Sequence, residues 1–511
     1  MTVAFNNTPG DIRVPLFYAE VNAGVPPYSG TSCLLLLGRK LAGSALPALA
    51  AQNIGSTDPN YLAGRGSMLA DMIAISRYHN PVGETWVMDV GDPAGATAAT
   101  GTLTITGTAT APGTLVRYIA GERYSVGVAL GDTPAIIAAA FAAVVGKGFT
   151  KYGRRLGAPV VATAAAGVVT LTAQHTGVEG NAIRIETGLD GDEVDPAGIT
   201  VAIGAMANGA GVVDLAVVFA ALGNTQFDWL VGPYASVAQL NAARDFLSDS
   251  GTGRWSPTVG LDGHYITINN GNLSAQTTLG STRNDRHATI LGTLNYPQAP
   301  WSIAAGAAAI TAFSKNLGRS LTEAIEIARP LQTLVVTGIR PPKALSDRWG
   351  LADRDSLYRN GISAFTVNND GTMALERVVT TYQTNLYGQA DITFLDIETI
   401  AIAAYVKRYI KLIVTSTYPR HVLRDDNPGG LQGVVTPAQM RSTMIHAYTQ
   451  LSLAGLVEKP ELFTQYLIVE RSGDPNRLNA YLPTDVANQF RVFAANITLF
   501  QELTDQNASL Q

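Results

Sequence analysis

The stretch SCLLLLGRK, residues 32–40, indicates the fold class of the first globular unit of this chain. Its run of leucines is typical of a buried strand. The helical spacing of Met68, Met72 and Ile75 predicts a helix over about 65–79, and GETWVMDVGDP (83–93) predicts a second strand. The order strand, helix, strand therefore predicts an α/β layer with a parallel sheet.

The composition changes at about residue 96, where Thr, Gly and Val begin to alternate with turn residues. This pattern predicts short antiparallel strands, interrupted by one helix, DTPAIIAAAFAAVV, with Asp132 as its expected N-cap. The α/β pattern returns in FDWLVGPYASVAQLNAARDFLSD (227–249), where Ser236 is the expected helix cap. We therefore predict a β-rich domain at 96–207, inserted into a discontinuous α/β domain of 26–95 and 208–375.

Residues 376–489 are predicted to form a compact α+β domain. ERVVTTYQTN (376–385) and LFTQYLIVERS (462–472) predict strands, and ADITFLDIETIAIAAYVKRYIKLIV (390–414) leads into a long helix. Thr436 and Pro437 open a second helix, which is expected to end near Gly455.

Each end of the chain carries a strand pattern set apart from the middle. DIRVPLFYAE (11–20) has a proline that suits a sheet edge, and FRVFAANITLF (490–500) alternates between two faces. We assign 1–25 to an N-terminal arm and linker and 490–511 to a C-terminal arm. On pattern alone, each strand could equally pair within its own subunit. The candidate strand-forming residues are Ile12, Val14, Leu16, Tyr18, Phe490, Val492, Phe493, Ile497 and Leu499.

The composition favours a subunit whose surface is covered by neighbours. Of the 511 residues 46% are hydrophobic and only 15% are charged, against about 25% in an average soluble protein. The alternative is an ordinary soluble protein rich in Ala and Gly. The net charge of −5 argues against direct nucleic-acid binding, and the apolar stretches are too short for membrane insertion. One cysteine, Cys33, and an N-terminus without a signal-peptide pattern predict synthesis in the cytosol.

No constellation of residues predicts an enzyme, a metal site or a cofactor. The six histidines lack metal-ligand spacing, and the Gly-rich stretches match no phosphate-binding loop. The acidic group LDGDEVDPAG (189–198) lacks the spacing of a calcium loop, so a solvated turn is favoured. Ser32 in GTSC superficially resembles a serine-protease nucleophile, but it precedes a strand rather than opening a helix.

A basic strip on the long C-terminal helix is a candidate contact surface. Lys407 and Lys411 share one helical face and Arg408 is adjacent. Such a strip is usually a solvated face, but it could also meet an acidic partner.

Several longer stretches are distinctive when taken together. The most specific is D-G-x-x-x-x-E-R (370–377) followed by T-T-Y-Q-T-N (380–385). The others are RNDRHATILG (283–292), PQAPWSIAAGAAAITAF (297–313), NGISAFTVNNDGTMALERVVTTYQTNLYGQADITFLDIETI (360–400), YPRHVL (418–423) and VVTPAQMRSTMIHAY (434–448). These stretches resemble the contractile bacteriophage tail sheath family, in particular its Mu-like branch. The resemblance runs from about 210 to the end and includes DIRVPLFYAE, and it is weakest in 96–207.

The resemblance implies a structural protein of the virion, assembled in the host cytoplasm. It implies a subtilisin-like sheath domain without a catalytic triad, and subunits stacked as hexameric rings around an inner tail tube. It also implies that the C-terminal domain faces the tube, with Lys407, Arg408 and Lys411 as possible contacts. Both arms would exchange strands with neighbouring subunits, and contraction would drive genome delivery. Implied partners are other copies of the chain, the tail tube, the baseplate and the tail terminator.

Three readings remain open from the sequence. The first is the tail sheath of a contractile phage or of a phage-tail-like bacteriocin. The second is the sheath of another contractile injection machine, such as a secretion apparatus. The third is a hydrolase on a subtilisin-like fold, which predicts loss of activity on Ser32→Ala.

Overall fold

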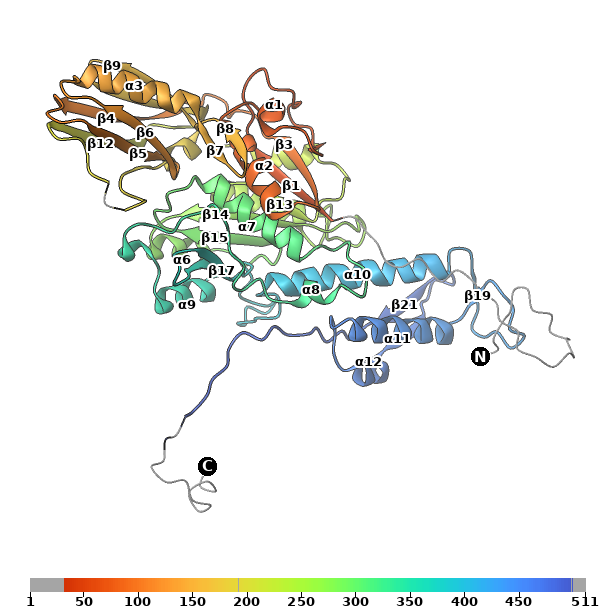
Figure 1. Cartoon of the computed structure of the whole chain (residues 1–511). Coiled ribbons are helices and arrows are strands. Elements are labelled where there is room, and N and C mark those ends of the chain that lie inside the picture. The colour runs from red at the N-terminus through yellow and green to blue at the C-terminus, as the bar shows by residue number, and fades with distance from the viewer. Residues whose placement is uncertain (1–31, 192, 498, 500–511) are drawn as a thin grey trace, which may run out of the picture.

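The structure is a computed structural model that describes residues 32–191, 193–497 and 499. The described part is elongated, with an antiparallel β domain at one end, a parallel sheet in the middle and a helical domain at the other end (Figure 1). The mixed α/β, multidomain architecture predicted from the sequence is confirmed. The predicted N-terminal strand, with Ile12, Val14, Leu16 and Tyr18, lies outside the described residues.

An eight-stranded sheet forms the middle of the molecule. The six central strands are parallel, and an antiparallel strand closes each edge. This is the parallel layer that SCLLLLGRK indicates. In spatial order the strands are β17 (Met373–Arg377), β16 (Ile362–Val367), β15 (Ala288–Thr293), β14 (His264–Asn270), β13 (Trp229–Val231), β1 (Cys33–Gly38), β3 (Glu84–Asp89) and β2 (Gln52–Asn53).

The leucines of β1 bury both faces of this sheet. Leu34 and Leu36 belong to the core on the side of α2 (Met68–His79) and α7 (Pro300–Ser314). Leu35 and Leu37 belong to a second core with α4 (Leu215–Ala221) and α5 (Val237–Leu247). All four side chains are fully buried, each contributing about 2 kcal/mol of hydrophobic free energy. A strand covered on both faces has no polar side to alternate with, which explains the unbroken run.

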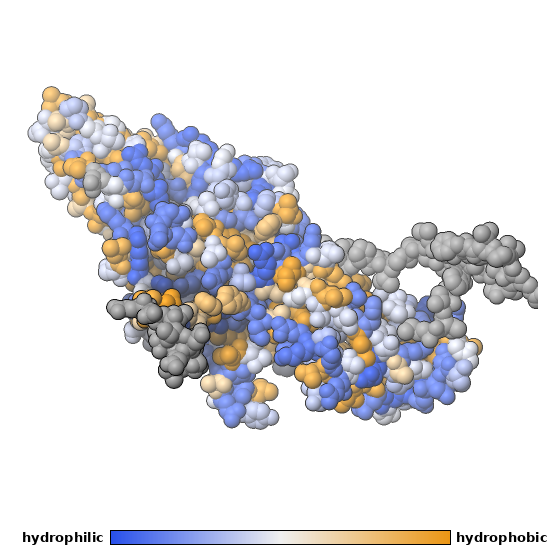
Figure 2. Space-filling model, turned by 60° about the horizontal axis from the view of Figure 1, so that its bottom comes forward, coloured by the Kyte–Doolittle hydropathy of each residue, from blue (hydrophilic) through white to orange (hydrophobic). Residues whose placement is uncertain are grey.

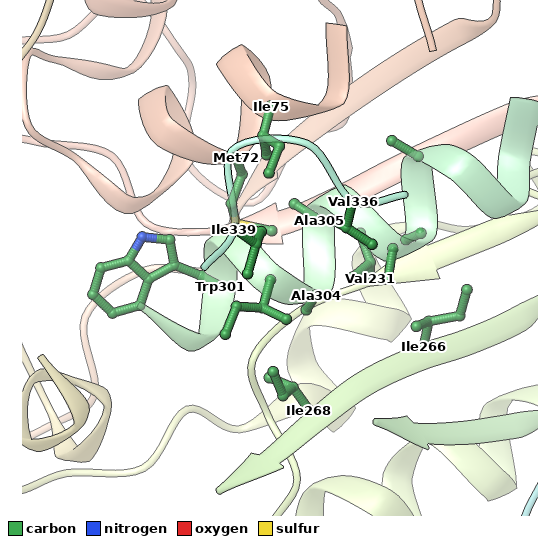
Figure 3. Close-up of a cluster of buried hydrophobic side chains, with 14 of the residues drawn as sticks. Met72, Ile75, Val231, Ile266, Ile268, Trp301, Ala304, Ala305, Val336 and Ile339 are labelled. Carbon is green, nitrogen blue, oxygen red and sulfur yellow. The ribbon is translucent and has the colours of Figure 1, made fainter. Parts of the chain in front are cut away.

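Close packing between α7 and α2 depends on a glycine. In Figure 3, α7 lies between the sheet residues Val231 and Ile266 and the α2 residue Ile75. A Cβ atom added to Gly306 would lie 2.8 Å from Cδ1 of Ile75 and 3.0 Å from Cγ1 of Val336. The small residues of AAGAAA (304–309) therefore allow the two helices to approach more closely than larger side chains would.

Two of the three helix caps expected from the sequence are confirmed. The expected caps Ser236 of α5 and Thr436 of α11 (Pro437–Leu453) both form capping boxes with a glutamine three residues later. In α3 (Pro134–Lys147) the N-cap is Thr133, and the prediction of Asp132 is wrong by one residue. Asp132 instead accepts a hydrogen bond from the backbone N–H of Ala129 at 2.7 Å, which closes the preceding turn.

The described residues of 96–207 form two larger antiparallel sheets, one two-stranded hairpin, one α-helix and a short 3-10 helix. In the first sheet the order is β12 (Ile199–Ala207), β4 (Ala98–Gly107), β10 (Val168–Thr176) and β9 (Val160–Ala165). The second is β11 (Ile185–Glu186), β5 (Gly113–Ile119) and β6 (Glu122–Val128). Helix α3 packs against β9 and β6, and a hairpin of β7 (Phe149–Lys151) and β8 (Arg154–Leu156) follows it. This stretch interrupts the parallel sheet between β3 and β13.

The inserted stretch covers part of the carboxyl edge of the parallel sheet. Arg39, directly after β1, is buried and pairs with Glu179 of the insertion. The backbone N–H of Met68 donates to Nε2 of His175 at 3.0 Å, and burial lowers the pKa of His175 to about 3. Open α/β sheets hold their ligands at this edge. Here buried protein contacts occupy that position.

The acidic stretch 189–198 is exposed at Asp190, Gly191 and Val194, as expected for a solvated turn, and arginines pair with three of its carboxylates. Arg117 holds Asp195 through two bonds of 2.7 Å, and Arg123 binds Glu193 at 3.0 Å. Arg340, from the body of the protein, pairs with Asp190. The pair between Arg340 and Asp190 ties the insertion to the rest of the molecule, whereas the other two pairs lie within the insertion.

The C-terminal domain is built on helix α10 (Ile397–Thr417), which packs against α11. The predicted long helix is therefore present. The predicted strand ERVVTTYQTN is largely absent: β17 ends at Arg377, and the boundary placed at 375/376 falls inside this strand. LFTQYLIVERS is a strand only in its second half. The C-terminal domain also contains α12 (Pro460–Tyr466), a parallel pair β18 (Val422–Leu423) and β19 (Val434–Val435), and a hairpin β20 (Ile468–Arg471) and β21 (Leu478–Tyr481). The remaining described elements lie earlier in the chain: α1 (Pro59–Ala63), the 3-10 helix η1 (Val178–Ala182), α6 (Leu273–Ser281), α8 (Ile325–Ala328), the 3-10 helix η2 (Leu345–Asp347) and α9 (Leu351–Arg359).

The surface mixes polar and apolar residues, and Figure 2 shows apolar residues scattered between polar ones over the visible face. Within the described ranges, every helix is too short or too polar to span a lipid bilayer.

Candidate functional site

The C-terminal arm carries five exposed large apolar residues within ten positions of the chain. Within the described residues, no strand follows β21, so the arm pairs with no sheet of its own subunit there. The predicted strand residues are exposed to between 76% and 90%: Phe490, Val492, Phe493, Ile497 and Leu499. An apolar segment of this length stays in water at a cost unless another surface covers it.

The root of the arm is fixed to the body by an arginine. NH2 of Arg491 lies 3.0 Å from Oδ1 of Asp396 and 2.9 Å from Oε2 of Glu398. The Glu398 side chain is fully buried, and that of Arg491 is only 13% exposed. This contact is not predictable from the sequence, because nearly a hundred residues separate the partners and no local pattern marks them.

A hairpin in the C-terminal domain offers unpaired edges. Among the described residues β20 and β21 pair only with each other, with Ile468 opposite Tyr481. These two side chains are 53% and 61% exposed. The inner residue Val469 packs against the core of the domain. A two-stranded ribbon is marginal by itself and gains stability from a third strand.

Two residues of the basic strip on α10 are engaged inside the chain. Nε of Arg408 binds Oδ2 of Asp262 at 2.7 Å, and its NH2 pairs with Asp228, which is fully buried. Lys407 also pairs with Asp262 and lies over the ring of Trp255. Arg408 is thus largely buried and neutralised within its own chain, whereas Lys411 is exposed and Lys407 is partly exposed. The tube contact of Lys407, Arg408 and Lys411 stays a prediction.

A cleft of about 640 Å³ lies near the amino end of β15. It contains His287, whose Nε2 lies 3.0 Å from Oδ1 of Asp249. Burial opposes ionisation of this carboxyl, but the bonds from His287 and Arg286 lower the pKa of Asp249 to about 2. Ser248 and Ser250 line the same cleft, and their hydroxyls lie 3.2 Å from each other. Within the described residues Nδ1 of His287 has no hydrogen-bond partner and Nε2 is engaged by Asp249 and Arg286, so neither serine completes a serine–histidine–aspartate arrangement.

A turn at the rim of this cleft presents two apolar side chains to solvent. Leu386 and Tyr387 are 101% and 88% exposed. The turn is held by hydrogen bonds from Asn385 N–H to Gln389 O, at 2.9 Å, and from Gly388 N–H to Asn385 O, at 3.0 Å. The tip is thus apolar and well ordered by its own bonds.

Ser32 lies buried directly before β1. Within the described residues its hydroxyl has no hydrogen-bond partner, histidine included. No group of three or more His, Cys, Asp or Glu side chains is arranged to hold a metal ion in the part of the chain that the structure describes.

Two family models match consecutive parts of the chain. The phage tail sheath protein central domain matches residues 208–381, and the phage tail sheath C-terminal domain matches residues 389–500. The arm root at Arg491 and the hairpin β20–β21 both lie within the second match.

The chain is also similar to named relatives. It is 35% identical over 501 residues to the Mu-like prophage FluMu tail sheath protein of Haemophilus influenzae, covering 97% of this chain and 99% of the relative. Among solved structures, the sheath tail protein of Desulfitobacterium hafniense aligns with a TM-score of 0.48 and 13% identity, covering 92% of this chain and 97% of that one. The sheath tail protein Lin1278 of Listeria innocua aligns with a TM-score of 0.48 and 12% identity, covering 90% and 93%.

The resemblance stated from the sequence is confirmed by these matches. They identify a structural component of the tail of a contractile phage or of a phage-like injection system, and hence a virion-associated protein. The chain belongs to the phage tail sheath family.

Proposed function

We propose that this chain polymerises as stacked hexameric rings around an inner tail tube and contracts to drive the tube through the host envelope for genome delivery. The observation that carries the proposal is the C-terminal arm, whose apolar residues are exposed and unpaired within the described part of their own subunit. A phage-tail-like bacteriocin or another contractile injection machine would use the same subunit geometry.

The arm donates a strand to the hairpin β20–β21 of a neighbouring subunit. Each backbone hydrogen bond contributes about 1 kcal/mol, and alternate side chains fill pockets of the recipient. Ile468 and Tyr481 of the hairpin supply an exposed apolar surface for Phe493 and Ile497 of the arm. The N-terminal strand DIRVPLFYAE is a second donor. Every subunit both donates a strand and accepts one. Many contacts of moderate affinity therefore act together and hold the lattice by avidity.

Contraction converts a kinetically trapped lattice into one that buries more area between subunits. The linkers between arm and body let rigid bodies rotate while the mesh persists. In this scheme the C-terminal domain faces the tail tube, with Lys411 as a contact, and the ends of the sheath meet the baseplate and the tail terminator. The subunits assemble in the host cytoplasm and remain in the virion.

Electron microscopy of two truncations of the arm tests the proposal. Removing residues 492–511 keeps the root contacts of Gln489 and Arg491 but deletes the donated strand. We expect long hollow tubes from the full chain and only monomers or small oligomers from the truncated chain. A second truncation after Gln489 should behave in the same way.

A matched pair of substitutions distinguishes the effect of strand pairing from the effect of removing the C-terminal arm. Ala494→Pro removes one backbone N–H and disfavours pairing at the centre of the arm, whereas Ala494→Ser keeps the donor. We expect the proline variant to lose tubes and the serine variant to keep them. Tubes of normal length from the truncated chain and the proline variant would contradict strand exchange at this end. A full chain that stays monomeric across salt and concentration would contradict the proposed function itself.

A further inference from the structure

We propose that Arg491 is a positioning residue that fixes where the C-terminal arm leaves the subunit and thereby selects the neighbour that receives it. This inference rests on the strand exchange proposed above. We call the stretch from Ala487 to Arg491, which joins the C-terminal domain to the exposed part of the arm, the arm root.

The arm root is tied to the body at three successive points. The N–H of Ala487 donates to the carbonyl of Leu456 at 3.0 Å. Two residues later, Nε2 of Gln489 donates to the carbonyl of Ala328 in α8 at 3.2 Å. Arg491 closes the series, and the apolar side chains beyond it are exposed. The last fixed point thus separates a held segment from a free one.

The two carboxylates that bind Arg491 are each also held by hydrogen bonds from other residues. Asp396 already accepts two bonds from Arg377, at 2.8 and 2.9 Å. Oε1 of Glu398 accepts the N–H of Leu331 at 2.9 Å, which leaves Oε2 for Arg491. A guanidinium that enters a preorganised and largely buried acidic site loses less entropy per bond than a surface ion pair. Removing it also leaves the buried carboxylate of Glu398 with fewer partners.

The anchor lies where the two sheath domains meet. Arg377 ends β17 of the central sheet, whereas Asp396 and Glu398 are at the start of α10 in the C-terminal domain. Figure 1 shows that the C-terminal arm leaves the body near α8 and the start of α10. The exit point therefore moves with the rigid body of the subunit and not with the hairpin that precedes it.

Loss of the Arg491 contacts would change both the distance that the C-terminal arm can span and the direction in which it leaves the subunit. Without Arg491 the last fixed point would be Gln489, so the free segment would begin at residue 490, which adds roughly 7 Å of extended chain at about 3.3 Å per residue. A longer and less directed tether lowers the effective concentration of the arm at its proper recipient and raises it at others.

Chymotrypsin treatment of the unassembled protein at low concentration tests the anchor. Cleavage after Phe490 requires a mobile arm root, whereas cleavage after Phe493 does not. We expect the ratio of cleavage at Phe490 to cleavage at Phe493 to rise about tenfold in Arg491→Met, because proteolysis follows the open population. Glu398→Gln, which leaves the sequence around the cut unchanged, should act in the same direction. Arg491→Lys should restore part of the protection.

The control is Arg420→Met, which removes an exposed arginine of the same domain and should leave the ratio unchanged. An unchanged ratio in both Arg491→Met and Glu398→Gln would overturn the anchor, whether or not the protein polymerises.

Electron microscopy of assembled material tests the choice of neighbour. We expect wild-type tubes with one helical lattice, and mixed lattices or irregular aggregates from Arg491→Met. A released arm root combined with a wild-type lattice would overturn the selection of the neighbour. Absence of tubes from the wild-type chain would contradict the proposed function, and the cleavage ratio would still decide the anchor.

Discussion

Nε of Arg408 on α10 lies 2.7 Å from Oδ2 of Asp262, a residue that precedes β14 of the central sheet. The same guanidinium pairs with Asp228, which precedes β13. Burial lowers the pKa of Arg408, but its two aspartate partners outweigh this and raise the pKa above the usual value. The C-terminal helix is thus clamped to the amino edge of the parallel sheet.

Arg408→Met should destabilise the protein strongly. Asp228 and Asp262 would be left buried with an incomplete set of partners, and breaking a buried pair from one side costs about 3–5 kcal/mol. The measurement is the free energy of unfolding from urea titration. Lys411→Met is the control, since it removes an exposed cation of the same helix and should change stability by less than about 0.5 kcal/mol. Equal stabilities of the two variants would contradict the clamp.

Two helical glycines should respond to alanine in opposite directions. Gly306→Ala places a Cβ 2.8 Å from Ile75 and should cost about 1–3 kcal/mol through overpacking. Gly146 of α3 has open space around the corresponding position, so Gly146→Ala should gain about 0.5–1 kcal/mol of helix propensity. Thermal unfolding of both variants checks the pair. A stabilised Gly306→Ala protein would show that α7 and α2 are not closely packed.

Stability should depend on the titration of a buried lysine. Burial lowers the pKa of Lys315 from 10.5 to about 8, while Glu398 and Glu326 oppose the shift and Arg491 and Arg319 add to it. Between about pH 8 and pH 10.5 the unfolded chain binds a proton at this site that the folded chain does not. The contribution of Lys315 to the free energy of unfolding therefore rises with pH in this window.

The comparison is between wild type and Lys315→Met, each unfolded in urea at pH 7.5 and pH 9.5. The wild type should gain roughly 1–2 kcal/mol relative to the variant at the higher pH. Tyrosine ionisation affects both proteins alike and cancels in the difference. The prediction would be contradicted if the free energy of unfolding of the wild type minus that of the variant stayed constant or fell between pH 7.5 and pH 9.5.

The apolar tip at the rim of the cleft should affect assembly without affecting the fold. Leu386 and Tyr387 make little contact with their own subunit, so the double variant Leu386→Ser, Tyr387→Ser should unfold at the wild-type urea concentration. If the tip is covered in the assembled sheath, the critical concentration for tubes should rise about tenfold, as for loss of an apolar anchor. Sedimentation of tubes over a concentration series measures this. A shifted urea midpoint would contradict the first expectation, and an unchanged critical concentration the second.

Local patterns predicted the elements whose signals lie within a few residues of each other. The leucine run of β1, the spacing of Met68 and Met72 in α2, and the caps Ser236 and Thr436 were found in this way. Asp132 was misassigned because Asp and Thr are both good caps. The N-cap position is occupied by Thr133, and the Asp132 carboxylate instead accepts a hydrogen bond from Ala129 in the turn before α3. The strand predicted at 376–385 failed because β17 ends early and the following residues bond to the segment 284–288 and to each other.

The sequence by itself determined the fold class, the family and the apolar character of the C-terminal arm, because periodicity and motifs are properties of neighbouring residues. Only the tertiary structure decided which charges are free. Arg408 is separated from Asp262 by 146 residues and from Asp228 by 180, so no window of sequence shows that its charge is neutralised. The anchor at Arg491 has the same origin, because folding brings Asp396 and Glu398 to it from more than ninety positions away. Burial of a charge depends on long-range packing, and packing is what a local pattern does not contain.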